Sequence, residues 1–104
     1  MAGAALRAAV LALLSCAGAA MAQDGLLARD LAAVCANCHG TDGHARGSLL
    51  KPLAGMPADT LIAAMNSFRG VAHPTTVMQQ LAKGFSDEQI KAIAAYYATQ
   101  PARP

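Results

Sequence analysis

Apolar side chains recur along this chain at the spacing of one helical face, with polar residues between them. The first such stripe contains Leu27, Leu31, Val34 and Cys38. A second lies in "PADTLIAAMNSFRG", between Pro57, which suits a first helical turn, and Gly70, which suits helix termination. Its apolar positions are Leu61, Ile62, Met65 and Phe68. Because no segment alternates apolar and polar β-branched residues as strands do, the pattern predicts an all-α fold.

The clearest helix signal lies near the C-terminus, in "FSDEQIKAIAAYYATQP" at residues 85–101. Ser86 is placed to cap the first turn, and Gln89 is placed to complete a capping box. Pro101 blocks continuation of the helix. The predicted buried stripe is Ile90, Ile93, Ala94 and Tyr97. A shorter helix is predicted at residues 77–83, closed by the following glycine, which brings the expected total to about four short helices.

The N-terminal segment has a different composition from the rest of the chain. Residues 1–22 contain Arg7, an apolar run at residues 8–14 and a small-residue end, which are the three parts of a secretory signal peptide. We expect cleavage after Ala22 and a domain of residues 23–104 in the periplasm. The apolar run is shorter than the roughly 20 residues of a membrane-spanning helix, so no membrane span is predicted.

Cys16 raises an alternative to this cleavage. The stretch "LLSC", followed by small residues, resembles a bacterial lipoprotein signal, in which the cysteine becomes the lipidated first residue. The site after Ala22 is the better one, and its use would discard Cys16, so no lipid anchor is expected. The domain then contains two cysteines, Cys35 and Cys38.

Two cysteines in a small exported domain require an explanation. Free thiols do not persist in an oxidising compartment. A chain of this size also buries little surface, and such small domains usually need a disulfide, a metal or another addition to the core. Both cysteines lie in "CANCH", residues 35–39. We therefore expect this motif to bring a group other than protein into the core.

Three chemistries compete for the motif. A thioredoxin-like dithiol works at the start of a helix that follows a strand, whereas this pair is predicted at a helix end with no βαβ pattern around it. A structural zinc site needs four ligands, and beyond Cys35, Cys38 and His39 the remaining partners are His44 and His73. The third chemistry is covalent haem attachment, for which Cys-x-x-Cys-His is the recognised pattern.

Helical geometry favours haem attachment. Residues three apart on a helix project from one face, so Cys35 and Cys38 can both form thioethers with the vinyl groups on one porphyrin edge. His39 follows directly and can then face the iron. Covalent tethering would also retain a cofactor that so small a domain cannot enclose. We predict one covalently attached haem c.

The chain resembles class I cytochromes c over most of residues 25–100. The resemblance is carried by the helix leading into "CANCHG", the loop with "KPLAG" and the final "SDEQIKAIAAYYA". More closely, "LAGMPADTLIAAMNSFRG" and "HPTTVMQQLAKGFSDEQIKAIAAYYA" are similar to the cytochrome subunit of flavocytochrome c sulfide dehydrogenase, whose relatives include periplasmic dihaem cytochromes. The resemblance implies a cytochrome c fold, with about four short helices around one haem.

The resemblance also implies a methionine as the second axial ligand of the iron, at Met78. This residue lies 39 positions after His39 and eight before the helix cap. Met65 falls in an apolar helical stripe and is expected to pack in the core. Met56 is next to a predicted turn and could pack under the haem. His73 is the alternative ligand, although a solvated loop histidine is its more ordinary role, as it is for His44.

A loop proline completes the implied site. In the family, a proline of this loop offers its backbone carbonyl to the other ring nitrogen of the proximal histidine, which fixes the ring and raises its basicity. The matching residue here is Pro52, 13 positions after His39. It follows Lys51, where the family commonly has glycine.

Such a site implies one-electron transfer rather than catalysis. With both axial positions filled, a substrate has no ready place to bind, and a thioether ligand favours the reduced iron. The closer resemblance implies the electron-accepting subunit of a flavoprotein sulfide dehydrogenase. A free carrier between respiratory complexes is the alternative, and a haem sensor in which Met78 releases the iron for a gas is a third.

The charge of the predicted domain gives little information about its redox partner. Without Arg7, seven Lys and Arg stand against six Asp and Glu. No basic patch with interleaved aromatic residues indicates nucleic-acid binding. A small, weak interface with a redox protein suits a carrier that must dissociate quickly.

Overall fold

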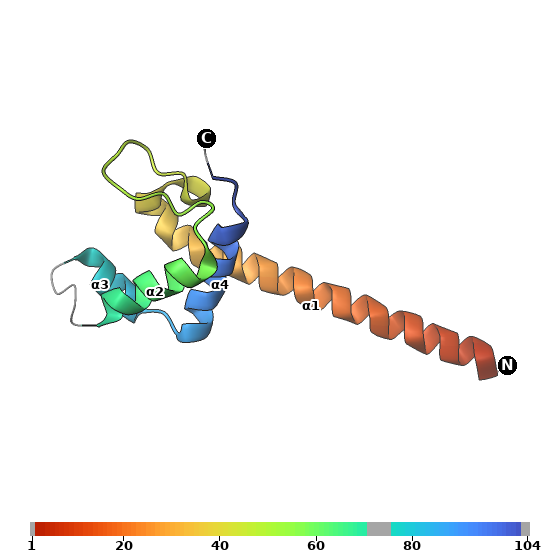
Figure 1. Ribbon diagram of the computed structural model, residues 1–104. Coiled ribbons are helices and arrows are strands. Elements are labelled where there is room, and N and C mark those ends of the chain that lie inside the picture. Colours follow the sequence, from red (N-terminus) through yellow and green to blue (C-terminus); the bar gives the residue numbers. More distant parts are fainter. Residues whose placement is uncertain (1, 71–75, 103–104) are drawn as a thin grey trace.

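The computed structural model describes residues 2–70 and 76–102, with the side chains of residues 14–22 outside that description. In chain order its elements are α1 (Ala2–His39), the 3-10 helix η1 (Thr41–Gly43), α2 (Ala58–Arg69), α3 (Val77–Lys83) and α4 (Asp87–Thr99) (Figure 1). No strand occurs within these ranges. The predicted all-α fold is confirmed.

Helix α1 is continuous through the predicted cleavage position. Its N-terminal half extends away from the other helices, and the side chains of residues 2–13 are all exposed (Figure 1). The first residues that contact the core are Leu31 and Ala32. The described side chains of the predicted signal segment therefore contribute nothing to the core. Among the residues that the structure describes, none of the helices has the length and apolar character needed to cross a bilayer.

Helix α4 forms the centre of the core, as its apolar stripe predicted. Its buried residues are Ile90, Ile93, Ala94 and Tyr97. They pack against Ala32 of α1, Leu61 and Met65 of α2, and Ala82 of α3. Burying an isoleucine side chain contributes about 1.5–3 kcal/mol. Met65 is 6% exposed, so the prediction that it packs in the core is confirmed.

The stripe predicted on the first helix is only in part the face that packs. Leu31 packs against the core as predicted, whereas Leu27, Val34 and Cys38 are exposed and the fully buried residue is Ala32, on an adjacent face. The buried Tyr97 hydroxyl donates a hydrogen bond to the Ala32 carbonyl oxygen at 2.7 Å, which satisfies the polar end of the side chain.

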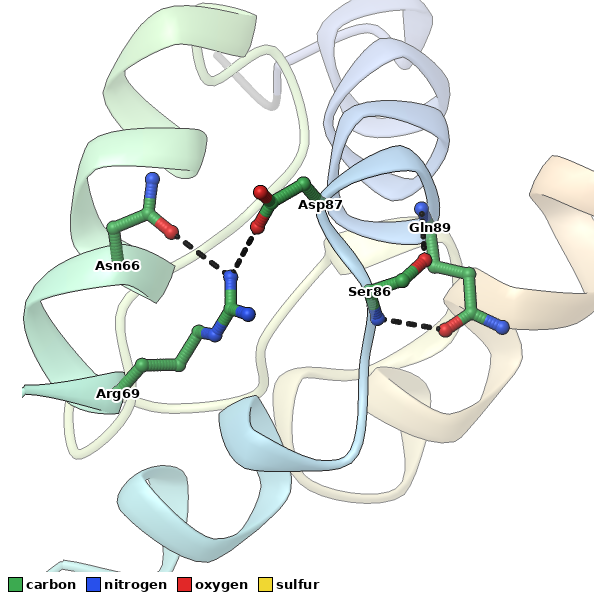
Figure 2. A network of polar contacts seen from close by, with 5 residues as sticks. All are labelled: Asn66, Arg69, Ser86, Asp87 and Gln89. Atoms are coloured by element: carbon green, nitrogen blue, oxygen red, sulfur yellow. Dashed lines mark hydrogen bonds and ion pairs between the residues drawn. The ribbon is translucent and has the colours of Figure 1, made fainter.

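The start of α4 has the predicted capping box. Ser86 Oγ accepts a hydrogen bond from the Gln89 backbone N–H at 3.2 Å, and the Ser86 N–H donates to Gln89 Oε1 at 2.9 Å (Figure 2). The helix ends at Thr99, two residues before Pro101. Local sequence signals therefore predicted both ends of this helix correctly.

Gly43 joins the loop of residues 44–57 to the helices. Its carbonyl oxygen accepts hydrogen bonds from the backbone N–H groups of Leu53 at 2.9 Å and Ala54 at 3.2 Å. It is buried and has φ +82°, which favours glycine. A Cβ at this position would lie 2.5 Å from the Ala54 nitrogen and 2.9 Å from the ring of Tyr97. The loop therefore approaches α4 closely only because residue 43 has no side chain.

We predict that Gly43→Ala destabilises the fold more than Gly47→Ala does. Both glycines have positive φ, but a Cβ at Gly47 would meet nothing within 4 Å. The backbone strain is shared, and the steric clash occurs only at Gly43. The free energy of unfolding, measured in guanidinium chloride, should fall by about 1–3 kcal/mol more for Gly43→Ala. Equal losses of unfolding free energy in the two variants would contradict the close approach of Ala54 and Tyr97 to Gly43.

Candidate haem attachment site

The last residues of α1 carry the three side chains of the motif. Cys35, Cys38 and His39 all belong to this helix, which ends at His39. Cys35 is half-buried and Cys38 is exposed, and the two are not joined as a disulfide. The pair therefore lies at the end of a helix, as predicted, and not at the helix start that a thioredoxin-like dithiol uses.

The surroundings of Cys35 also disfavour a reactive dithiol. Burial raises the pKa of the Cys35 thiol, and a hydrogen bond with the Tyr97 hydroxyl opposes this only in part. Burial likewise raises the pKa of Tyr97, with Cys35 as a further cause. A redox-active thiol instead needs surroundings that lower its pKa. Cys35 thus lies beside the crossing of α1 and α4, where burial disfavours a thiolate.

His39 is oriented by the backbone of the following loop. Its Nδ1 lies 2.8 Å from the carbonyl oxygen of Lys51. A carbonyl oxygen can only accept, so Nδ1 donates this hydrogen bond, and in the neutral ring with this tautomer the lone pair is on Nε2. This is the arrangement of a metal-binding histidine whose second nitrogen is fixed by a backbone carbonyl.

The accepting carbonyl differs by one residue from the prediction. We expected the carbonyl of Pro52, and the structure instead places that of Lys51 at His39. Lys51 supplies the carbonyl of the peptide bond to Pro52, and a residue before proline is restricted to extended backbone conformations. The proline therefore acts on the backbone that accepts the bond, while its own carbonyl is not the acceptor.

His44, the other histidine among the described residues, plays no comparable part. His44 is half-buried after η1, where its backbone N–H donates to the Thr41 carbonyl oxygen at 3.0 Å. His73 lies outside the described residues. Within residues 2–70 and 76–102, no group of three His, Cys, Asp or Glu side chains is arranged to hold a metal ion.

Two methionines are half-buried at the edge of the core. Met78 lies in the first turn of α3 and packs against the core, and Met56 follows the turn at Ala54 and Gly55. The Met56 backbone N–H donates to the Leu53 carbonyl oxygen at 3.1 Å. Met65 is excluded from a ligand role by its place in the core. Met56 and Met78 therefore remain as candidate sulfur ligands.

Several large apolar side chains that are close to Met56 or Met78 in the sequence are exposed. Leu49 and Leu50 lie in the loop that leads to Lys51, and Val77 and Leu81 lie on α3 beside Met78. Leu49 is 96% exposed and Val77 is 66% exposed. In the view of Figure 1 this loop and α3 lie on the same side of the helical body, away from the N-terminal half of α1. Side chains exposed in this way are available to contact an apolar ligand.

Taken together, these residues fit a covalently attached haem. The donor set contains two thiols three positions apart, one imidazole with Nε2 free, and two candidate thioethers. The exposed leucines and valine offer apolar surface to a porphyrin. Each of these groups matches a need of the cofactor.

Comparison with known proteins agrees. Residues 22–96 match the family described as "Cytochrome C oxidase, cbb3-type, subunit III". The chain belongs to the cytochrome c family. It is 34% identical over 82 residues to cytochrome c-554(548) of Halomonas halodenitrificans. The aligned residues are 76% of this chain and 99% of that cytochrome. The resemblance seen in the sequence is confirmed.

Two further relatives are named for sulfur metabolism. The cytochrome subunit of sulfide dehydrogenase from Chlorobaculum tepidum is 36% identical over 63 residues, which is 61% of this chain and 56% of that subunit. The thiosulfate dehydrogenase electron acceptor of Stutzerimonas stutzeri is 34% identical over 84 residues, 78% of this chain and 38% of that protein. The chain spans little more than half of the first and under half of the second.

Membership of this family establishes the cofactor and the general function. Cytochromes c carry covalently bound haem c and transfer electrons rather than catalyse a reaction on a substrate. The predicted cofactor and the predicted role as an electron carrier are therefore confirmed. Sequence reasoning missed the Lys51 carbonyl and the contact between Tyr97 and Cys35. The only signal for the first was the "KP" pair, because any residue can supply a backbone carbonyl.

Proposed function

We propose that Cys35 and Cys38 bind the haem as thioethers and that His39 Nε2 and the Met78 sulfur are the axial ligands of its iron. The hydrogen bond between His39 Nδ1 and the Lys51 carbonyl oxygen carries this proposal. It leaves one nitrogen free for the metal and prevents the ring from rotating. It also polarises the Nδ1–H bond and leaves more electron density on the ring, which makes Nε2 a stronger ligand.

Met78 is the preferred second ligand. It is half-buried in α3, with exposed Val77 and Leu81 beside it. A thioether sulfur favours ferrous over ferric iron and raises the reduction potential. Haem c supplies the iron that gains and loses one electron. The protein holds the ligands in place in both oxidation states and excludes water with apolar side chains.

We propose that residues 1–22 are a signal peptide and that residues 23–104 act in the periplasm. The described side chains of residues 2–13 are exposed and outside the core, and the family match begins at residue 22. Both observations suit a segment that is removed after export.

The exported protein should begin at Gln23, because the small residues at Ala20 and Ala22 suit signal peptidase. Mass spectrometry of the protein from a periplasmic extract measures this directly. An Ala22→Lys variant, in which the small residue is replaced, should keep the N-terminal segment. A mature protein that begins with an acylated Cys16 would contradict the proposal and establish a lipid anchor.

We propose further that the donor of electrons is a flavoprotein dehydrogenase that oxidises sulfide, with this chain as its haem subunit. Support comes from the relative named as a sulfide dehydrogenase subunit, and a second relative is named as an electron acceptor of a thiosulfate dehydrogenase. A free carrier is the second candidate. It is favoured by the match to nearly the whole of the Halomonas cytochrome.

Met78→Ala should abolish the weak red methionine-to-iron absorption band of the oxidised protein and let carbon monoxide bind the reduced protein. The reason is that the variant loses its second axial ligand. Optical spectra of the haem-loaded protein, before and after reduction, measure both effects. Wild-type protein should show the band and no response to carbon monoxide.

Met56→Ala is the matched control, because Met56 is the other half-buried methionine at the core. It should keep the band and remain insensitive to carbon monoxide. Loss of the band in Met56→Ala alone would transfer the ligand role to Met56. A strong carbon monoxide response in the wild type would contradict the electron-carrier site and support a gas sensor.

The donor can be identified in the organism that makes the protein. If the chain is a haem subunit, gel filtration of a periplasmic extract should give one species with flavin and haem in a fixed ratio, and adding sulfide should reduce its haem. Thiosulfate serves as the parallel substrate. Elution as a small protein without flavin, together with no reduction by sulfide, would reject the subunit and favour the free carrier.

A further inference from the structure

A polar cluster joins the two ends of the segment that carries Met78. Arg69 is the last residue of α2, and Asp87 is the first residue of α4. Arg69 Nη1 lies 2.5 Å from Asp87 Oδ1 and 3.2 Å from Asn66 Oδ1 (Figure 2). Helix α3, with Met78, lies between these two points in the chain. The cluster therefore connects the two residues, Arg69 and Asp87, that lie at the ends of this segment.

Both sides of the cluster are anchored in regular structure. Asn66 lies one turn before Arg69 on α2 and accepts a hydrogen bond from the same guanidinium group, which orients it toward α4. Asp87 follows the capping residue Ser86, so its backbone is fixed by the capping box. The guanidinium lowers the pKa of the Asp87 carboxyl, and Lys91 adds to this effect. Asp87 is thus charged at neutral pH and faces a cation in a defined position.

The cluster lies beside an open surface depression of about 140 Å³ between α2 and α4, lined by Ile62, Asn66, Asp87, Ile90 and Lys91. The contact between Arg69 and Asp87 therefore joins the two helices at the solvent-exposed edge of their interface.

Helix α3 depends on its neighbours for its position. It has seven residues, and a helix of this length is not stable alone in water. Its one fully buried side chain is the small Ala82, and Val77 and Leu81 are exposed. It packs mainly against α2. A small shift of α2 relative to α4 would therefore move α3 and the sulfur of Met78 with it.

We propose that Arg69, together with Asn66 and Asp87, is a positioning element that keeps Met78 at the haem iron. This inference rests on the proposed axial role of Met78. The pair acts by fixing α2, on which α3 packs, relative to α4. Its loss should increase the fraction of molecules in which the methionine is detached, without preventing the fold from forming.

The expected effect is small, because the pair is accessible to water. The side chains of Arg69 and Asp87 are 32% and 67% exposed, and ion pairs of this kind are weak and screened by salt. An external ligand such as imidazole must displace the methionine before it binds ferric iron. Its affinity should therefore rise by roughly twofold to fivefold when the pair is broken.

The experiment is an imidazole titration of the oxidised, haem-loaded protein, followed through loss of the methionine-to-iron band. Arg69→Gln and Asp87→Asn should each bind imidazole more tightly than the wild type, and Arg69→Lys, which keeps the charge, should lie between. Glu88→Gln is the matched control, since it removes a neighbouring carboxylate from the same helical turn. It should behave as the wild type. High salt should reduce the difference in imidazole affinity between the wild type and Arg69→Gln.

Met78→Ala separates the two ways in which the proposal can fail. If it binds imidazole much more tightly while Arg69→Gln and Asp87→Asn match the wild type, the positioning role is wrong and the ligand is right. If Met78→Ala leaves the affinity unchanged, the proposed ligand is wrong and the positioning role falls with it. An equal increase in Glu88→Gln would also overturn the proposal, because general charge loss would then explain the effect.

Discussion

The crossing of α1 and α4 at Tyr97 is the contact on which the rest of the structure depends. The Tyr97 hydroxyl bonds to the Ala32 carbonyl oxygen, its ring lies against Gly43, and its own carbonyl oxygen accepts the Gly55 N–H at 2.9 Å. Cys35 lies beside the same side chain. One residue of the last helix therefore positions the end of α1, where the attachment motif lies, and both ends of the loop that supplies the Lys51 carbonyl.

The size of the core explains why this crossing matters so much. The buried apolar residues of the described chain are few, and several are alanines. Leu49 and Leu50 in the loop and Val77 and Leu81 on α3 remain exposed. Cytochromes c carry haem c, and an apolar cofactor can complete a core that the protein alone leaves small. The covalently attached haem thus compensates for the small amount of apolar surface that the protein fold can bury by itself.

Local sequence signals were enough for part of this structure. The capping box at Ser86 and the apolar stripe of α4 involve residues that are neighbours along one helix, so both were predicted correctly. The burial of Ala32 on α1 was not, because its hydrogen-bond partner Tyr97 lies 65 positions away in the chain. The Lys51 carbonyl and the bond between Arg69 and Asp87 join residues 12 and 18 positions apart, and neither has a local pattern. All three features are tertiary contacts that no local pattern predicts.

The hydrogen bond between His39 and Lys51 has a consequence for variation in this protein. Its acceptor is a main-chain atom, so no replacement of the lysine side chain can delete it directly. In the proposed site, the electron-donating strength of the imidazole is thereby protected from most point mutations. Differences in reduction potential between natural variants should instead arise from insertions or deletions that alter the course of the loop, or from the far side of the iron.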